Sequence, residues 1–409
     1  MKQYLFFIVF FFVFQLSYAQ CNGRYVNNLF AVDTMQNIQF GENIKYDNTN
    51  QKLFFDLYKP KSDTAKNRPC LVFCFGGSFV SGDKRSPELV YLANEFAKKG
   101  YVCISIDYRL DNSFNLLVEE SMTKAVVRAI QDGRASLRYL NKYSDSLGID
   151  TNQIFIGGTS AGGILALNLT FMDQGDKLPA NWLNWANSIG GLEGNSGNVG
   201  YSSKVKGAFA FAGALGDTAF LNEMDYPVYM CHSTNDATVL NGYGKPIGGL
   251  APVSLFGSKT IKEATDRMGI YSVYDEYNSV AHPPFVGVTA SLSLTLDHMT
   301  TFLFNVLTCN PAKTYEPKPK AKNQSFSSLE NRKNAINIYP NPSTDFIEIR
   351  TSMPLETTHI LDIYGRKMPL EWISGGEHRA LSLLNYPKGL YSLILKLGER
   401  NIITKFVKD

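Results

Sequence analysis

Short apolar runs alternate with amphipathic stretches over most of the chain. An alternation of apolar and polar positions predicts an opening hairpin at residues 37–47 and 52–60. Further strand-like runs follow at residues 70–75, 101–108, 153–157, 205–213, 227–232 and 272–277. Most of them are largely apolar, as is typical of buried parallel strands. Helical patterns lie between the runs, at residues 87–100, 121–143, 163–172 and 291–307. The predicted fold class is α/β, with a mostly parallel central sheet and flanking helices.

The end of the chain has a different pattern. Residues 335–409 contain short runs of alternating apolar and polar residues, separated by Pro, Gly and Asn turns, which predict a small antiparallel β-sandwich. Residues 311–334 are rich in Lys, Pro, Ser and Asn and have almost no apolar periodicity, so we expect an extended linker. Residues 20–310 then form the large α/β domain.

The first residues resemble an export signal. One lysine precedes an apolar run of about a dozen residues, and Ser17-Tyr18-Ala19 follows with the small-x-small pattern of signal peptidase sites. The run is shorter than the roughly 20 residues that a spanning helix needs, so residues 1–19 are predicted to be a cleaved signal peptide. Cys21 also allows a lipoprotein reading, which the preceding Gln20 disfavours. No other segment is predicted to span a membrane.

Six cysteines in an exported chain make disulfides possible, although their pairing cannot be read from sequence. Cys70, Cys74 and Cys103 lie inside predicted strands, where we expect buried, unpaired thiols. Cys21 and Cys309 bracket the large domain, and we expect a disulfide between them.

The positive net charge lies outside the large domain. The whole chain carries +3; the signal peptide contributes +1, the linker +4 and the C-terminal domain +1, which leaves −3 for residues 20–310. This distribution gives no reason to expect nucleic acid as a partner.

One Gly-rich turn suggests a nucleophile. The sequence GTSAG at residues 158–162 fits the G-x-S-x-G elbow, in which a serine sits on a strained strand-to-helix turn with its hydroxyl exposed. A buried strand is predicted before this turn and an apolar helix after it, which is the context that the elbow needs. A structural turn is the alternative interpretation, but this context favours Ser160 as a nucleophile.

A serine hydroxyl needs an imidazole to take its proton and a carboxylate to orient that imidazole. His282 and Asp236 each follow a predicted strand, at the sheet edge where sites of open α/β sheets are built. They are the preferred base and acid. The alternatives for the base are His298 and His232, of which His232 more readily packs beneath the Asp236 loop. The alternatives for the acid are Asp217 and Asp225, which follow the preceding strand.

An acyl-transfer site also needs amide donors for the developing oxyanion. Gly76, Gly77 and Ser78 follow a central strand and could supply such amides, and Ala161 directly after the nucleophile could supply another. A flexible turn is the simpler interpretation of the Gly-Gly-Ser sequence taken alone.

Residues from about 21 to 310 resemble the α/β-hydrolase superfamily, in particular its carboxylesterase and lipase branch. The resemblance rests on FGGSF at 75–79, GTSAGG at 158–163, HSTND at 232–236 and VAHPPF at 280–285. It implies a hydrolase that needs no metal or organic cofactor. In two places the sequence departs from the HGGG-type oxyanion loop of this branch. Phe75 replaces the leading His, and Ser78 replaces the third Gly, although Ser78 still offers an amide.

The tail resembles the C-terminal sorting domain of type IX secretion substrates. The matching segments are residues 336–349, 361–368 and 386–409, which occur in the family's order at the end of the chain. This resemblance implies passage through the outer membrane, with the secretion machinery as a partner and a secreted or cell-surface destination. A generic adhesion or sugar-binding sandwich is the alternative.

Together these features predict a secreted serine hydrolase that cleaves carboxylic esters. The chain has no long apolar lid, which favours short-chain or polysaccharide-linked esters over long triglycerides. Phe79 and two tryptophans of the segment 174–204, Trp182 and Trp185, are candidate substrate-binding residues. The alternatives are a serine peptidase related to the prolyl oligopeptidases and an inactive hydrolase fold that binds a surface ligand.

Overall fold

The computed structural model describes most of the chain. The described residues are 23–112, 117–172, 176, 178–222, 225–287, 289–307, 337–339, 345–350, 357–362, 366–372, 378–397 and 400–408. They fall into two compact units, Met1–Lys318 and Pro319–Asp409. The division between the units lies in the segment expected to be a linker.

Eight strands form the main sheet of the first unit, in the order β1-β2-β4-β3-β5-β6-β8-β11. Their bounds are β1 (Val32–Ile44), β2 (Asn50–Pro60), β3 (Arg68–Cys74), β4 (Val102–Ile106), β5 (Ile149–Thr159), β6 (Gly207–Phe211), β8 (Val228–Ser233) and β11 (Ser272–Tyr277). The β1-β2 and β2-β4 pairs are antiparallel, and every later pair is parallel. The predicted fold class is confirmed.

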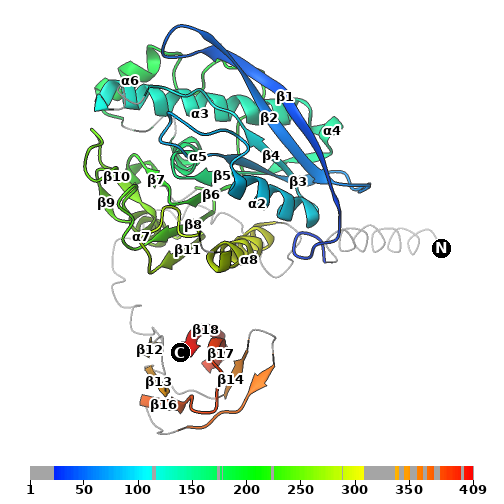
Figure 1. The fold of residues 1–409 in the computed structure, drawn as a ribbon, viewed down its shortest axis with the longest axis vertical. Helices are drawn as coiled ribbons and strands as arrows, with labels where there is room; N and C mark the ends of the chain where they lie inside the picture. The colour runs from blue at the N-terminus through cyan, green and yellow to red at the C-terminus, as the bar shows by residue number, and fades with distance from the viewer. Residues whose placement is uncertain are drawn as a thin grey trace, which may run out of the picture. The chain divides into compact units, whose positions relative to one another are not determined.

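Helices cover both faces of this sheet (Figure 1). The helices α3 (Glu119–Lys142) and α5 (Ala161–Phe171) lie on one face, and α2 (Pro87–Lys98) and α8 (Thr289–Val306) lie on the other. All residues of α5 are buried, because this helix is enclosed between the sheet and α3. An apolar sequence without a polar face suits such a position.

Several elements were not predicted from the sequence. They are the helices α4 (Ser144–Leu147), α6 (Ala180–Asn187) and α7 (Ser258–Met268), the 3-10 turn η2 (Thr218–Phe220), and a small sheet of β7 (Ala214–Leu215), β10 (Leu255–Gly257) and β9 (Tyr243–Gly244). Apart from α4, which directly precedes β5, these elements lie in the connections that leave the carboxyl ends of β5, β6 and β8. The functional residues expected from the sequence gather at the same edge.

The second unit consists of two antiparallel sheets. One contains β12 (Asn337–Tyr339), β13 (Phe346–Arg350) and β16 (His378–Ser382); the other contains β15 (Lys367–Met368), β14 (Thr357–Leu361), β17 (Gly389–Leu397) and β18 (Arg400–Lys408). Ile347 and Leu381 of the first sheet share one buried cluster with Ile360, Leu393 and Phe406 of the second. The two sheets therefore pack face to face, as a sandwich requires.

The buried, unpaired state predicted for Cys70, Cys74 and Cys103 is confirmed. The Cys21–Cys309 bridge, the signal peptide at residues 1–19 and the linker at 311–334 lie outside the described residues. Among the helices that the structure describes, none has the length and apolarity needed to cross a bilayer.

Candidate active site

Ser160 sits at a sharp turn between β5 and α5. Its backbone has φ 53° and ψ −117°, a conformation that L-residues rarely adopt and that the surrounding structure must stabilise. Close packing of the turn against β3 supplies that support: a Cβ at Gly158 would lie 1.9 Å from the Cys74 carbonyl oxygen. Only glycine allows this approach.

Three side chains from separate loops form one line of hydrogen bonds. His282 Nε2 lies 2.7 Å from Ser160 Oγ, and His282 Nδ1 lies 2.6 Å from Asp236 Oδ2. Asp236 follows β8 and His282 follows β11, and these strands are parallel neighbours. Because parallel strands end at the same edge, loops far apart in the sequence meet at the turn that carries Ser160.

The carboxylate of Asp236 is buried and closely held. Oδ1 accepts hydrogen bonds from the Thr238 amide at 2.8 Å and the Val239 amide at 3.1 Å, and Oδ2 faces His282. Burial alone would favour the neutral acid. Hydrogen bonds from His232, His282 and the Thr238 amide outweigh burial and hold the pKa of Asp236 well below its ordinary value. The acid is therefore an anion beside His282 at neutral pH.

His232, the alternative base at the end of β8, lies beneath the loop that carries Asp236. His232 is fully buried, with Nε2 2.8 Å from the Val239 carbonyl oxygen and Nδ1 2.8 Å from Ser258 Oγ. A carbonyl oxygen can only accept, so Nε2 carries the proton and Nδ1 accepts from the Ser258 hydroxyl. The same Nε2 lies 3.4 Å from Asp236 Oδ2. The His232 N–H thus lies near the same carboxylate oxygen that faces His282.

The remaining alternatives are engaged elsewhere. His298 lies on α8 with Nδ1 2.9 Å from Asp275 Oδ2. Asp217 accepts a hydrogen bond from the Ala219 amide in the 3-10 turn, and Asp225 accepts one from the Asn222 amide.

The loop after β3 lies beside Ser160 and shares its cavity lining through Ser78 and Phe79. Gly77, Ser78 and Phe79 all have positive φ values of 124°, 53° and 64°. A Cβ at Gly77 would lie 2.1 Å from the Ser81 carbonyl oxygen, so this position also requires glycine. Ala161 is the first residue of α5, where an amide has no partner within the helix. Gly76 packs against Ser160 and Thr159. The amides of this loop and of Ala161 remain the candidate oxyanion donors.

Phe75 replaces the histidine of the HGGG pattern and is held by Tyr108. The two rings stack with centroids 4.1 Å apart, and the Tyr108 hydroxyl donates to the Phe75 carbonyl oxygen at 2.9 Å. Both side chains are buried. A stacked ring pair and one hydrogen bond thus support the loop at the position where the sequence departs from the pattern.

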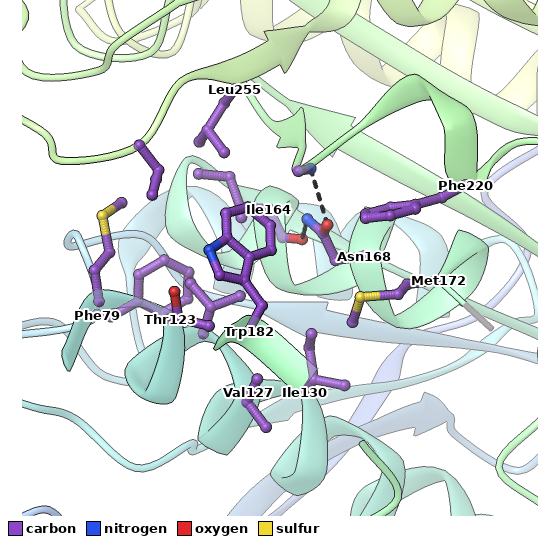
Figure 2. A pocket seen from close by; sticks show the side chains of 14 residues that line it. Phe79, Thr123, Val127, Ile130, Ile164, Asn168, Met172, Trp182, Phe220 and Leu255 are labelled. Atoms are coloured by element: carbon purple, nitrogen blue, oxygen red, sulfur yellow. Dashed lines mark hydrogen bonds between the residues drawn. The ribbon is translucent and has the colours of Figure 1, made fainter. Parts of the chain in front are cut away.

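A cavity of about 300 Å³ opens beside Ser160. Its lining is mostly apolar and consists of Ser78, Phe79, Val80, Leu117, Met122, Ser160, Ala161, Ile164, Thr238, Val239, Pro246, Ile247 and Ala251. Of the three substrate-binding candidates, only Phe79 belongs to this lining. Trp182 lines a second pocket, shown in Figure 2, and Trp185 lines neither.

Several residues of this lining were not predicted from the sequence, among them Met122, Ile164, Thr238 and Val239. Ile164 could have been found, since it lies one helical turn after Ser160 on the same face of α5. Thr238 and Val239, the second and third residues after Asp236, carry no sequence signal, because their role depends on the backbone path of the loop. Within the described residues, no group of three or more His, Cys, Asp or Glu side chains could hold a metal ion.

Family models match both units of the chain. Residues 55–204 match the model described as BD-FAE, and residues 337–409 match the secretion system C-terminal sorting domain.

Curated relatives match parts of the chain. Esterase LipC of Mycobacterium tuberculosis is 31% identical over 111 residues, which is 27% of this chain and 25% of that protein. Probable carboxylesterase 7 of Arabidopsis thaliana is 29% identical over 133 residues, 31% of this chain and 41% of that protein. The matched region thus spans well under half of either relative. The native Est2 esterase structure from Thermogutta terrifontis is 22% identical and covers 72% of this chain and 98% of its own, with a TM-score of 0.49.

Proposed function

We propose that this chain is an exported serine esterase of the α/β-hydrolase superfamily, a proposal supported by the BD-FAE match of residues 55–204 and the sorting-domain match of residues 337–409. The observation that carries the proposal is the hydrogen-bonded line from Ser160 through His282 to Asp236, at the mouth of an apolar cavity. The substrate is a carboxylic ester. The preference for short-chain or polysaccharide-linked esters stays a prediction from the sequence.

The proposed mechanism follows from the roles of these groups. His282 Nε2 takes the proton of Ser160 Oγ as this oxygen attacks the ester carbonyl, and the Asp236 anion stabilises the imidazolium that forms. The Gly77, Ser78 and Ala161 amides donate to the carbonyl oxygen as it becomes negative. His282 then returns the proton to the departing alcohol. Water releases the acyl group from Ser160 by the same steps in reverse order.

The proposed location follows from the two ends of the chain. Residues 1–19 direct the chain across the inner membrane and are cleaved, and residues 335–409 direct it through the type IX machinery to the cell surface or the medium. The sorting-domain match supports the second step.

The first experiment measures hydrolysis of p-nitrophenyl acetate, butyrate and palmitate by the full chain, with Ser160→Ala in parallel. We expect turnover to fall on the order of 10⁴- to 10⁶-fold in the variant, because the nucleophile is lost. An unchanged rate in Ser160→Ala would contradict the proposal.

An organophosphonate probe separates an esterase from an inactive binding protein. We expect the probe to label Ser160, since only an activated serine reacts. A folded wild-type chain that neither reacts with the probe nor hydrolyses any ester would favour the binding-protein alternative. Cleavage of peptides but not of esters would favour the peptidase.

A further inference from the structure

A second pocket lies next to the cavity at Ser160 and is lined in part by α5. The two share Phe79, Met122 and Ile164 as lining residues, so these three side chains form a common wall. The second pocket has a volume of about 60 Å³. It is further lined by Thr123, Val126, Val127, Ile130, Asn168, Met172, Trp182, Gly216, Phe220, Val253 and Leu255 (Figure 2).

The pocket is a groove between two helices with a tryptophan as its outer wall. Ile164, Asn168 and Met172 recur every four residues on α5 and line one face, while Met122, Val126 and Ile130 do so on α3. Trp182 projects from α6 across the groove (Figure 2). Its indole nitrogen donates to Glu119 Oε1 at 2.8 Å, which fixes the ring.

The lining offers very little to a polar ligand. Asn168 is the most polar side chain, but its Nδ2 donates to the Ile164 and Ala214 carbonyl oxygens and its Oδ1 accepts from the Gly216 amide. The indole N–H of Trp182 is used by Glu119. An occupant therefore gains by burying apolar surface, since the only side-chain polar group in the lining without a hydrogen bond described above is the Thr123 hydroxyl.

We infer that this pocket receives the distal part of an unbranched acyl chain of about eight carbons during ester hydrolysis, an inference that rests on the proposed function. With a rise of about 1.5 Å per residue, Ile164 lies about 6 Å and Asn168 about 12 Å along α5 from Ser160. Seven carbon–carbon bonds of about 1.5 Å in a zigzag extend roughly 9 Å, so an octanoyl group bound at Ser160 passes Ile164 and enters the groove.

The pocket volume agrees with this length. A water-sized group needs roughly 10–15 Å³ measured in this way, so the second pocket holds about four to six carbon atoms. The first carbons of the acyl chain remain in the cavity beside Ser160. The apolar walls therefore select for acyl chains that are longer than butyryl but short enough to fit within the groove.

The test compares p-nitrophenyl acetate, butyrate, octanoate and laurate with the full chain. Each methylene moved onto apolar surface improves binding about fourfold, so we expect kcat/KM to rise from acetate to octanoate and to fall at laurate. Thr123→Phe places a ring in the groove from a half-buried position. We expect the octanoate-to-acetate ratio to fall at least tenfold in this variant.

Trp182→Ala enlarges the groove, whereas Thr123→Phe fills it. Removal of the outer wall should shift the preferred substrate from octanoate toward laurate. Trp185→Ala is the matched control, since this tryptophan lies on the same helix and lines neither cavity; we expect the ratio of octanoate to acetate to match the wild type. Circular dichroism melting establishes that each variant is folded.

A binding measurement separates this inference from the proposed function. Octanoate is titrated by calorimetry into Ser160→Ala, and into the same protein with Thr123→Phe added. Binding to the first and at least tenfold weaker binding to the second would support the pocket whether or not Ser160 is the nucleophile. Equal binding to the two proteins, or a ratio of octanoate to acetate hydrolysis that Thr123→Phe leaves unchanged, would overturn the inference.

Discussion

The two sides of the candidate active site differ in the atoms that form their hydrogen bonds. On one side, Ser160, His282 and Asp236 interact through side-chain atoms. On the other, the proposed oxyanion donors are backbone amides of Gly77, Ser78 and Ala161, whose direction depends on positive φ values in the loop and on a helix start. A single substitution removes a side-chain group completely, whereas an amide survives most substitutions and is lost only when the backbone moves. Activity should therefore be sensitive to the loss of a functional group on the first side and to changes in backbone conformation on the second.

The largest effect in this comparison is expected at the acid. Asp236→Asn keeps the size of the side chain but removes the charge that orients and stabilises His282, and turnover should fall on the order of 10⁴-fold. Steady-state kinetics with p-nitrophenyl butyrate measure the loss. A fall of less than tenfold would show that another group serves as the acid.

The same substitution should change how stability depends on pH. The pKa of Asp236 is lowered in the folded protein, so its ionised form stabilises the fold above the unfolded value of about 3.9. This contribution disappears as the pH falls from about 5 through the folded pKa. The difference in unfolding free energy between wild type and Asp236→Asn should therefore shrink between pH 6 and pH 2 in denaturant titrations. A constant difference would contradict the lowered pKa.

An intermediate effect is expected in the amide loop. Gly77→Ala introduces a Cβ that would lie 2.1 Å from the Ser81 carbonyl oxygen at a φ of 124°, so the loop must shift. Loss of one oxyanion donor corresponds to about 10²- to 10³-fold in kcat. Ser78→Ala keeps both the loop and its amide and should lower kcat by less than fivefold. Equal losses in the two variants would contradict a role of the backbone.

The smallest effect is expected at the support behind this loop. Tyr108→Phe keeps the ring that stacks on Phe75 but removes the hydroxyl that donates to the Phe75 carbonyl oxygen. A buried hydrogen bond is worth about 0.5–1.5 kcal/mol, so kcat should fall about two- to tenfold while KM changes less. A change in KM alone would place Tyr108 in substrate binding and not in support of the loop.

The two sides also differ in how well the sequence predicted them. The residue types around Ser160 and the strand ends before Asp236 and His282 were sufficient to select residues that the structure brings together. The contribution of Tyr108 had no such signal, because a distant ring that supports a carbonyl oxygen is visible only in three dimensions.

The fold was predictable where periodicity was strong. All eight strands of the main sheet overlap predicted runs. The hairpin of β1 and β2 was predicted from alternating apolar and polar residues, and most of the parallel strands from the apolar sequences that burial requires. The helices α6 and α7 were missed in segments with many Gly, Asn and Lys residues, where tertiary contacts decide the structure. For this reason Trp182 and Trp185 were equally good candidates for substrate binding in the sequence, although only Trp182 lines one of the two pockets.

The approach of Gly158 to the Cys74 carbonyl oxygen has a consequence for directed evolution of this protein. Random mutagenesis at residue 158 should yield almost no active clones, since every other amino acid has a Cβ at the 1.9 Å contact. Diversity is better placed at Thr123 and Val126, whose side chains face a cavity and not a neighbouring strand. Tolerance to mutation around the nucleophile thus depends on the space available to the first side-chain atom more than on the distance from the serine.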